Sequence, residues 1–172
     1  MEFAAFYLCL AVAAAFFGYV GYQDFTEWKI RNKSVLILCG LYAVTAMAGM
    51  STTAIMTKGF INPTTDLYAG GLLFAMGFVF WALKWFGAGD AKLLFPTGLF
   101  VGWDHMMLFT IGLLVFAILF LVVLKSPFLQ AFSHTRIGFR IHEIASTRKT
   151  PYGVVIVLAL YVVMYARFVP AF

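Results

Sequence analysis

Long apolar runs alternate with short polar segments along the whole chain. A bilayer core of about 30 Å is crossed by about 20 apolar residues in a helix. Six runs are candidates: Phe3 to Tyr22, Ser34 to Met56, Leu67 to Phe86, Ala91 to Trp103, Met106 to Leu124 and Tyr152 to Phe168. The fourth run is short and contains Pro96 and Gly98, which favours a helix buried among other helices. The pattern predicts an all-α integral membrane protein with six transmembrane helices.

The composition agrees with this interpretation. Of the 172 residues, 63% are hydrophobic and only 11% are charged, whereas about 25% of the residues in soluble domains are charged. No Pro/Ser-rich linker and no charge run divides the sequence, so we expect residues 1–172 to form a single domain in the lipid bilayer. Cys9 and Cys39 lie within apolar runs and no CxxC pair occurs, which argues against a zinc ribbon. We expect no metal and no cofactor.

The basic residues predict the orientation in the membrane, because short cytoplasmic loops carry an excess of Lys and Arg. An extracytoplasmic N-terminus leaves only Lys58 and Arg167 outside. It places the other ten inside: Lys29, Arg31, Lys33, Lys84, Lys92, Lys125, Arg136, Arg140, Arg148 and Lys149. We therefore expect both termini to be extracytoplasmic. Because these loops account for the net charge of +5, no nucleic-acid partner is expected.

Two acidic residues are brought to the same face by this topology. Asp24 follows the first predicted span, and Asp90 lies between the third and the fourth. An acidic residue at a membrane segment is a candidate functional residue, although Asp24 and Asp90 could each be an interfacial charge. Gly87-Ala88-Gly89 precedes Asp90 at a helix entry, where glycine permits positive φ and close approach, and the helix N-terminus favours an ionised acid. An ordinary N-cap turn is the alternative interpretation.

Two carboxyl groups held close together in an apolar site share a proton, as in an aspartic protease. The ionised member takes a proton from water, and the protonated member hydrogen-bonds the carbonyl under attack. The sequence does not assign the proton to Asp24 or to Asp90. Two other functions remain open: a small transporter or channel subunit that uses both acids for protons or cations, and a scaffold without chemistry. A carrier is expected to place its acids near the midplane at a repeat interface, so their position at one edge favours hydrolysis.

Three motifs carry a resemblance to a known family. Gly87-Ala88-Gly89-Asp90-Ala91-Lys92-Leu93 matches the GxGDxKL signature of the type IV prepilin peptidases, which are membrane aspartyl proteases of the GxGD type. Asp24 followed by Ile30-Arg31-Asn32 resembles their first motif, with Arg31 where the family usually has Pro. Pro151-Tyr152-Gly153-Val154 resembles the opening of their last helix. Together the motifs extend over nearly the whole chain.

The resemblance implies an aspartic endopeptidase with Asp24 and Asp90 as catalytic residues and Gly87, Gly89, Lys92 and Asn32 in support. It implies prepilin-like substrates whose short basic leader is cut at the cytoplasmic face, and a place in the inner (cytoplasmic) membrane of a bacterial or archaeal cell. The chain lacks the Cys-rich insertion of the longer members that also N-methylate the pilin. It is therefore similar to the short peptidases of Flp, or tight-adherence, pili, and methyltransferase activity is not expected.

Other polar residues have more ordinary interpretations. Lys92 could act on Asp90 or extend to the lipid headgroups, and Asn32 is expected to cap the second helix. Glu27 is expected to be a solvated loop charge. The segment Pro127 to Thr150 mixes aromatic and basic residues, which predicts an amphipathic piece on the inner leaflet.

Overall fold

The computed structural model describes residues 2–53, 61–125 and 151–168, and all the regular secondary structure within these ranges is helical. It contains six α-helices and a short 3-10 helix, η1 (Trp103–His105). The α-helices are α1 (Glu2–Glu27), α2 (Asn32–Thr53), α3 (Pro63–Ala82), α4 (Ala88–Val101), α5 (Met106–Lys125) and α7 (Tyr152–Phe168). The predicted all-α class is confirmed.

Four helices are long and apolar enough to cross a membrane by length and composition. They are Ala4–Glu27 in α1, Asn32–Met50 in α2, Pro63–Ala82 in α3, and Trp103–Val123 in η1 and α5. Only 6% of the residues in the most apolar window of the last segment are buried within the protein, so nearly all of this segment is at least partly exposed. With 14 and 17 residues, α4 and α7 are shorter. The helices indicate a multi-pass membrane protein, while the count of six spans and the side of the termini remain predictions.

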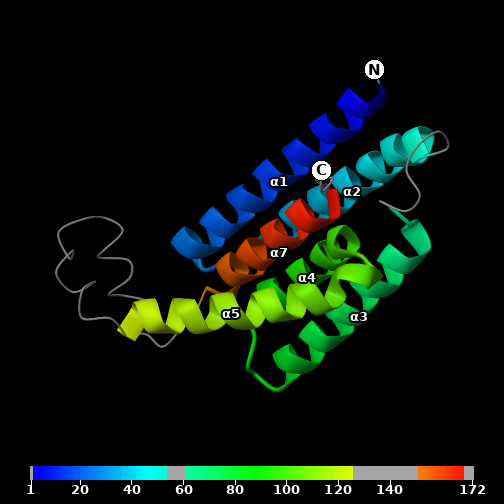
Figure 1. Ribbon diagram of the computed structural model, residues 1–172. Helices are drawn as coiled ribbons and strands as arrows, with labels where there is room; N and C mark the ends of the chain where they lie inside the picture. Colours follow the sequence, from blue (N-terminus) through cyan, green and yellow to red (C-terminus); the bar gives the residue numbers. More distant parts are fainter. Residues whose placement is uncertain (1, 54–60, 126–150, 169–172) are drawn as a thin grey trace.

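The helix α4 lies in the middle of the bundle, with α2, α3, α5 and α7 around it (Figure 1). Ten of its 14 residues are buried. It packs most closely against α3: a Cβ on Gly98 would lie 2.6 Å from Cα of Gly70, and a Cβ on Gly77 would lie 3.1 Å from Cα of Ala91. Such backbone approach is how helices associate tightly in membranes. The prediction that this short helix is buried among others is confirmed.

Several helix boundaries differ from the prediction, and α3, for example, ends at Ala82 instead of Phe86. Three helices extend past the predicted bound at the end that carries an acidic residue. The helix α1 continues to Glu27 instead of ending at Tyr22, α3 begins at Pro63 instead of Leu67, and α4 begins at Ala88 instead of Ala91. Counting apolar residues ends a helix at its first polar side chain, whereas backbone hydrogen bonding continues past that side chain. Asp24, Asp66 and Asp90 therefore lie inside terminal helical turns and not in the loops.

Candidate active site

Asp24 and Asp90 meet at one end of the bundle, beside the first turn of α7. Asp24 lies in the last turn of α1 and is 6% exposed, and Asp90 lies in the first turn of α4 and is 8% exposed. The backbone N–H of Gly153 donates a hydrogen bond of 3.0 Å to Oδ2 of Asp24, and the same N–H lies close enough to act on Asp90. We call this region, with Asp24, Asp90 and Gly153, the Asp24 end.

The charge on Asp90 depends on its burial and on Asp24. Burial, and secondly the negative charge of Asp24, raise the pKa of Asp90 to about 7, while the backbone N–H groups of Gly87 and Gly153 lower it. Loss of hydration therefore outweighs the N–H groups at the start of α4. The expectation that the backbone N–H groups at this helix start favour the ionised acid is confirmed for Gly87, but burial, which that expectation left out, has the larger effect. The influence of Asp24 indicates that the two carboxyl groups lie close together.

Two buried oxygen atoms at this end have no hydrogen-bond partner among the described residues: Oδ1 of Asp90 and Oε1 of Gln23. Buried polar atoms in proteins are almost always hydrogen-bonded, so such atoms need an explanation. An oxygen of this kind is available to a water molecule or a substrate. Sequence reasoning missed Gln23, although a polar residue beside Asp24 in an otherwise apolar helix was a signal that could have identified it.

The glycines near the carboxyl groups make room for them. A Cβ on Gly153 would lie 2.7 Å from Oδ2 of Asp24, and a Cβ on Gly87 would lie 2.9 Å from Oδ2 of Asp90. A Cβ on Gly89 would lie 3.1 Å from Cβ of Ile30, so Gly89 lets the segment after α1 pack against α4. Gly87 has an ordinary φ of −70°. Positive φ is therefore not the reason for glycine there, whereas close approach is.

Lys92 and Asn32 contact each other at the rim of the site. Nζ of Lys92 donates a hydrogen bond of 3.1 Å to Oδ1 of Asn32, which joins the starts of α4 and α2. Asn32 is the first residue of α2, so the expected cap is replaced by this contact. Glu27 forms an exposed ion pair of 3.4 Å with Arg31, which confirms its interpretation as a solvated charge.

Within residues 2–53, 61–125 and 151–168, no group of three or more His, Cys, Asp or Glu side chains could hold a metal ion. The predicted amphipathic segment Pro127 to Thr150 lies outside the described residues.

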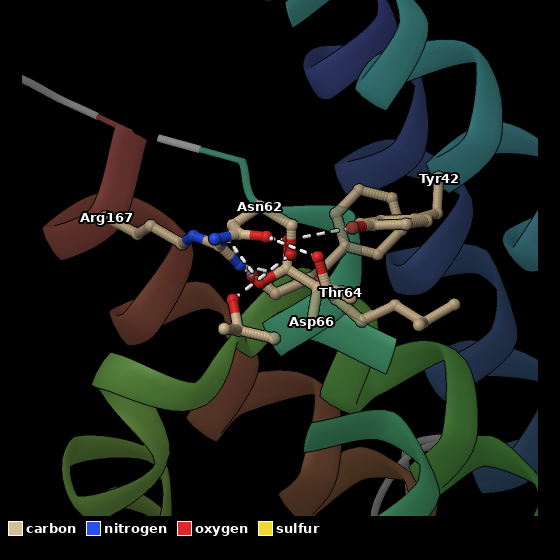
Figure 2. A network of polar contacts seen from close by, with 8 residues as sticks. Tyr42, Asn62, Thr64, Asp66 and Arg167 are labelled. Atoms are coloured by element: carbon tan, nitrogen blue, oxygen red, sulfur yellow. Dashed lines mark hydrogen bonds and ion pairs between the residues drawn. The ribbon is translucent and has the colours of Figure 1, made fainter. Parts of the chain in front are cut away.

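A second buried carboxylate lies at the opposite end of the bundle, which we call the Asp66 end. Nη2 of Arg167 contacts both carboxylate oxygens of Asp66 at 2.8 Å, and the hydroxyl of Tyr42 donates to Oδ2 at 2.7 Å (Figure 2). Nη1 of Arg167 donates to the carbonyl of Phe100 at 2.9 Å. These residues join α2, α3, α4 and α7. Gly102 passes beside them with φ of +68°, where a Cβ would lie 2.5 Å from Nη1 of Arg167.

Sequence reasoning missed this cluster, because Asp66 falls outside the predicted spans, just before the one that starts at Leu67, and Arg167 was placed among the extracytoplasmic charges. Both are buried, at 1% and 6% exposure. Two features of the sequence could have identified them. Arg167 lies in an apolar helix, and Asp66 is one of only seven acidic residues in the chain. The Asp66 end is a fully paired structural contact, in contrast to the Asp24 end.

Comparison with known proteins identifies the family. The model of the type IV leader peptidase family matches residues 11–123, which include Asp24 and Asp90. Neither the curated proteins nor the solved structures contain a match. The matched range covers more than half of the sequence and agrees with the resemblance carried by the motifs. This chain belongs to the type IV leader peptidase family.

Proposed function

We propose that the chain is an aspartic endopeptidase that removes the leader from type IV prepilin-like membrane proteins, with Asp24 and Asp90 as its catalytic pair. One observation supports this most directly: two buried carboxyl groups from α1 and α4 converge at the N–H of Gly153, and Oδ1 of Asp90 has no partner among the described residues. Buried, interacting carboxyl groups are typical of aspartic protease sites.

The reaction needs one ionised and one protonated carboxyl group. The ionised member accepts a proton from a water molecule, whose oxygen attacks the scissile carbonyl, and the protonated member hydrogen-bonds the carbonyl oxygen as it becomes negative. Collapse of the tetrahedral intermediate breaks the C–N bond, and the carboxyl group that took the proton from water passes it to the leaving amine. Asp90 fits the protonated role, because burial raises its pKa to about 7. Asp24 fits the base, since its Oδ2 accepts the N–H of Gly153.

The orientation of the site in the membrane is inferred from the charge distribution along the chain, whereas the substrate class is inferred from the family. The basic residues favour a cytoplasmic Asp24 end, so we propose cleavage at the cytoplasmic face of the inner membrane. Gly87 and Gly89 would hold the geometry at Asp90, and Lys92 with Asn32 would join α4 to α2 beside it. The absence of a Cys-rich insertion from the sequence favours leader removal without methylation, as in Flp pilus peptidases.

Transport is the less favoured function. The acids lie in terminal helical turns and not at mid-helix, where a carrier is expected to bind its ion. The family match also favours a peptidase.

Co-expression with a prepilin tests the proposal. Asp24→Asn and Asp90→Asn should each reduce leader removal by about 10³-fold or more, because a catalytic residue that acts as part of a unit is rarely dispensable. Glu27→Gln is the matched control, since Glu27 is an exposed acid three residues from Asp24. Leader removal is followed by the mass of the pilin, and membrane levels of each variant by immunoblot. Normal processing by either Asp→Asn variant would contradict the assignment.

A further inference from the structure

An open apolar groove runs between α1 and α7, beside the two carboxyl groups. Its volume is about 270 Å³, and its walls include Gly18, Gly21 and Phe25 of α1 and Val154, Leu158 and Tyr161 of α7. From Gly18 to Phe25 it follows about 10 Å of helix at 1.5 Å per residue. The groove is thus long enough for a few residues of an extended or helical chain.

The missing side chains of two glycines shape the groove. A Cβ on Gly21 would meet Val157 at an ordinary 3.5 Å, so the glycine leaves open space without a forced contact. At Gly18 the hydroxyl of Tyr161 occupies the place of a side chain, and it donates to the carbonyl of Ala14 at 2.8 Å. Because this hydroxyl is already paired, the groove presents a mainly apolar surface to an occupant.

One end of the groove opens at the candidate active site. Phe25 follows Asp24 and Val154 follows Gly153, and these two neighbours are joined by the 3.0 Å hydrogen bond from N of Gly153 to Oδ2 of Asp24. A chain that leaves the groove at Phe25 and Val154 therefore comes next to the residues of the candidate active site.

We propose that this groove binds the first apolar residues after the scissile bond of the substrate, while the polar leader lies beyond the carboxyl groups. The inference rests on the proposed function, because a leader peptidase cuts where a polar segment meets an apolar one. An apolar segment in the bilayer gains van der Waals contacts in a groove that it fills, whereas a polar leader would lose its hydration there. The leader therefore lies outside the groove.

Photo-cross-linking in the inactive Asp24→Asn protein tests the occupant. Leu158 on the groove wall and Ile37 on α2 are matched positions, 40% and 47% exposed, each a few residues into a helix that starts at the Asp24 end. Benzoylphenylalanine at position 158 should give an adduct with the co-expressed prepilin, located by mass spectrometry in the first apolar residues after the leader. The same probe at position 37 should give none. Adducts with lipid alone at position 158 would overturn the proposal.

Filling the groove provides an independent measurement. Gly21→Leu should raise KM for the membrane substrate about tenfold or more, with little change in kcat, since only binding contacts are removed. Gly40→Leu is the control, because a Cβ at Gly40 meets nothing within 4 Å. An unchanged KM in Gly21→Leu, or a fall in kcat alone, would overturn the groove assignment. If the unmodified protein processes no prepilin, the proposed function itself fails, so the two failures are distinguishable.

Discussion

The two ends of this bundle bury carboxylates in opposite ways. At the Asp66 end, Arg167 contacts both oxygens of Asp66 at 2.8 Å and Tyr42 donates a further hydrogen bond. At the Asp24 end, the negative charge of Asp24 acts on Asp90, and within residues 2–53, 61–125 and 151–168 neither acid forms an ion pair with a cation and Oδ1 of Asp90 has no partner. A paired buried charge serves the structure, whereas buried acids with perturbed pKa values are typical of functional sites.

The helix α7 connects the two ends. Gly153 in its first turn binds Asp24, and Arg167 in its last turn binds Asp66. Fourteen residues of helix separate them, which corresponds to about 21 Å. The ion pair fixes α7 against α3 and α4, and this position brings the N–H of Gly153 to Asp24 and Asp90. The paired end therefore stabilises the geometry of the unpaired end.

The largest effect on stability is expected at Arg167. Arg167→Met leaves the Asp66 carboxylate buried without its cation, which should lower the free energy of unfolding by about 3–5 kcal/mol. The variant Arg167→Met/Asp66→Asn removes both charges and should regain most of this loss. Thermal unfolding of the purified proteins in detergent measures both. If the double variant were no more stable than Arg167→Met, the loss would come from packing and not from an unpaired charge.

The second effect concerns activity at the other end of α7. Gly153→Ala places a Cβ 2.7 Å from Oδ2 of Asp24 and must displace that carboxyl group. A displacement of about 1 Å at a catalytic group reduces rates by about 10²-fold, so kcat for leader removal should fall by about that factor. Gly40→Ala, where a Cβ meets open space, is the control. Unchanged kcat in Gly153→Ala would show that the contact with Asp24 plays no part in the reaction.

A smaller loss of stability is expected at Tyr42. Tyr42→Phe removes the 2.7 Å hydrogen bond to Oδ2 of Asp66 but leaves the ion pair in place. Hydrogen bonds to charged groups contribute about 1.5–3 kcal/mol, and thermal unfolding should show a decrease near the lower limit. Tyr68→Phe in the same assay is the control, because Tyr68 is 68% exposed. An equal change in both variants would contradict a specific role for the Tyr42 hydroxyl.

The sequence predicted those features that depend on neighbouring residues. The bounds of α7 are confirmed, because its apolar run and its helix coincide. The approach of Asp24 and Asp90 followed from a topology set by charged loops. By contrast, Asp66 and Arg167 are 101 residues apart. Their contact depends on how α3, α4 and α7 pack together, which no local pattern reveals.

The contact between Gly153 and Asp24 was also not predicted, in part because it too depends on packing between distant segments. The motif Pro151-Tyr152-Gly153-Val154 was recognised only as a resemblance, and the reason for its glycine became visible when α7 was placed beside α1. Gln23 was missed because its burial depends on the helix continuing past Tyr22 to Glu27. Packing between distant segments therefore decides the details of both ends.

The smallest expected effect concerns the change in stability when a carboxylate charge is removed, which should have opposite signs at the two ends at pH 8. Burial raises the pKa of Asp90 to about 7, whereas the carboxyl group in the unfolded chain has the ordinary value of 3.8. The folded protein therefore loses stability as the pH rises from about 4 to 7, because only the unfolded state ionises freely over that range. At pH 5 Asp90 is protonated in the folded state, and Asp90→Asn should change the unfolding temperature little. At pH 8 the buried charge is present in the parent protein, so Asp90→Asn should be the more stable of the two.

Asp66→Asn should be destabilised at both pH values, since it leaves Arg167 buried without its anion. Thermal unfolding at the two pH values compares these variants. A loss of stability in Asp90→Asn at pH 8 would mean that the Asp90 carboxylate has a cationic partner in addition to the backbone N–H groups of Gly87 and Gly153, and the contrast between the two ends would then be wrong.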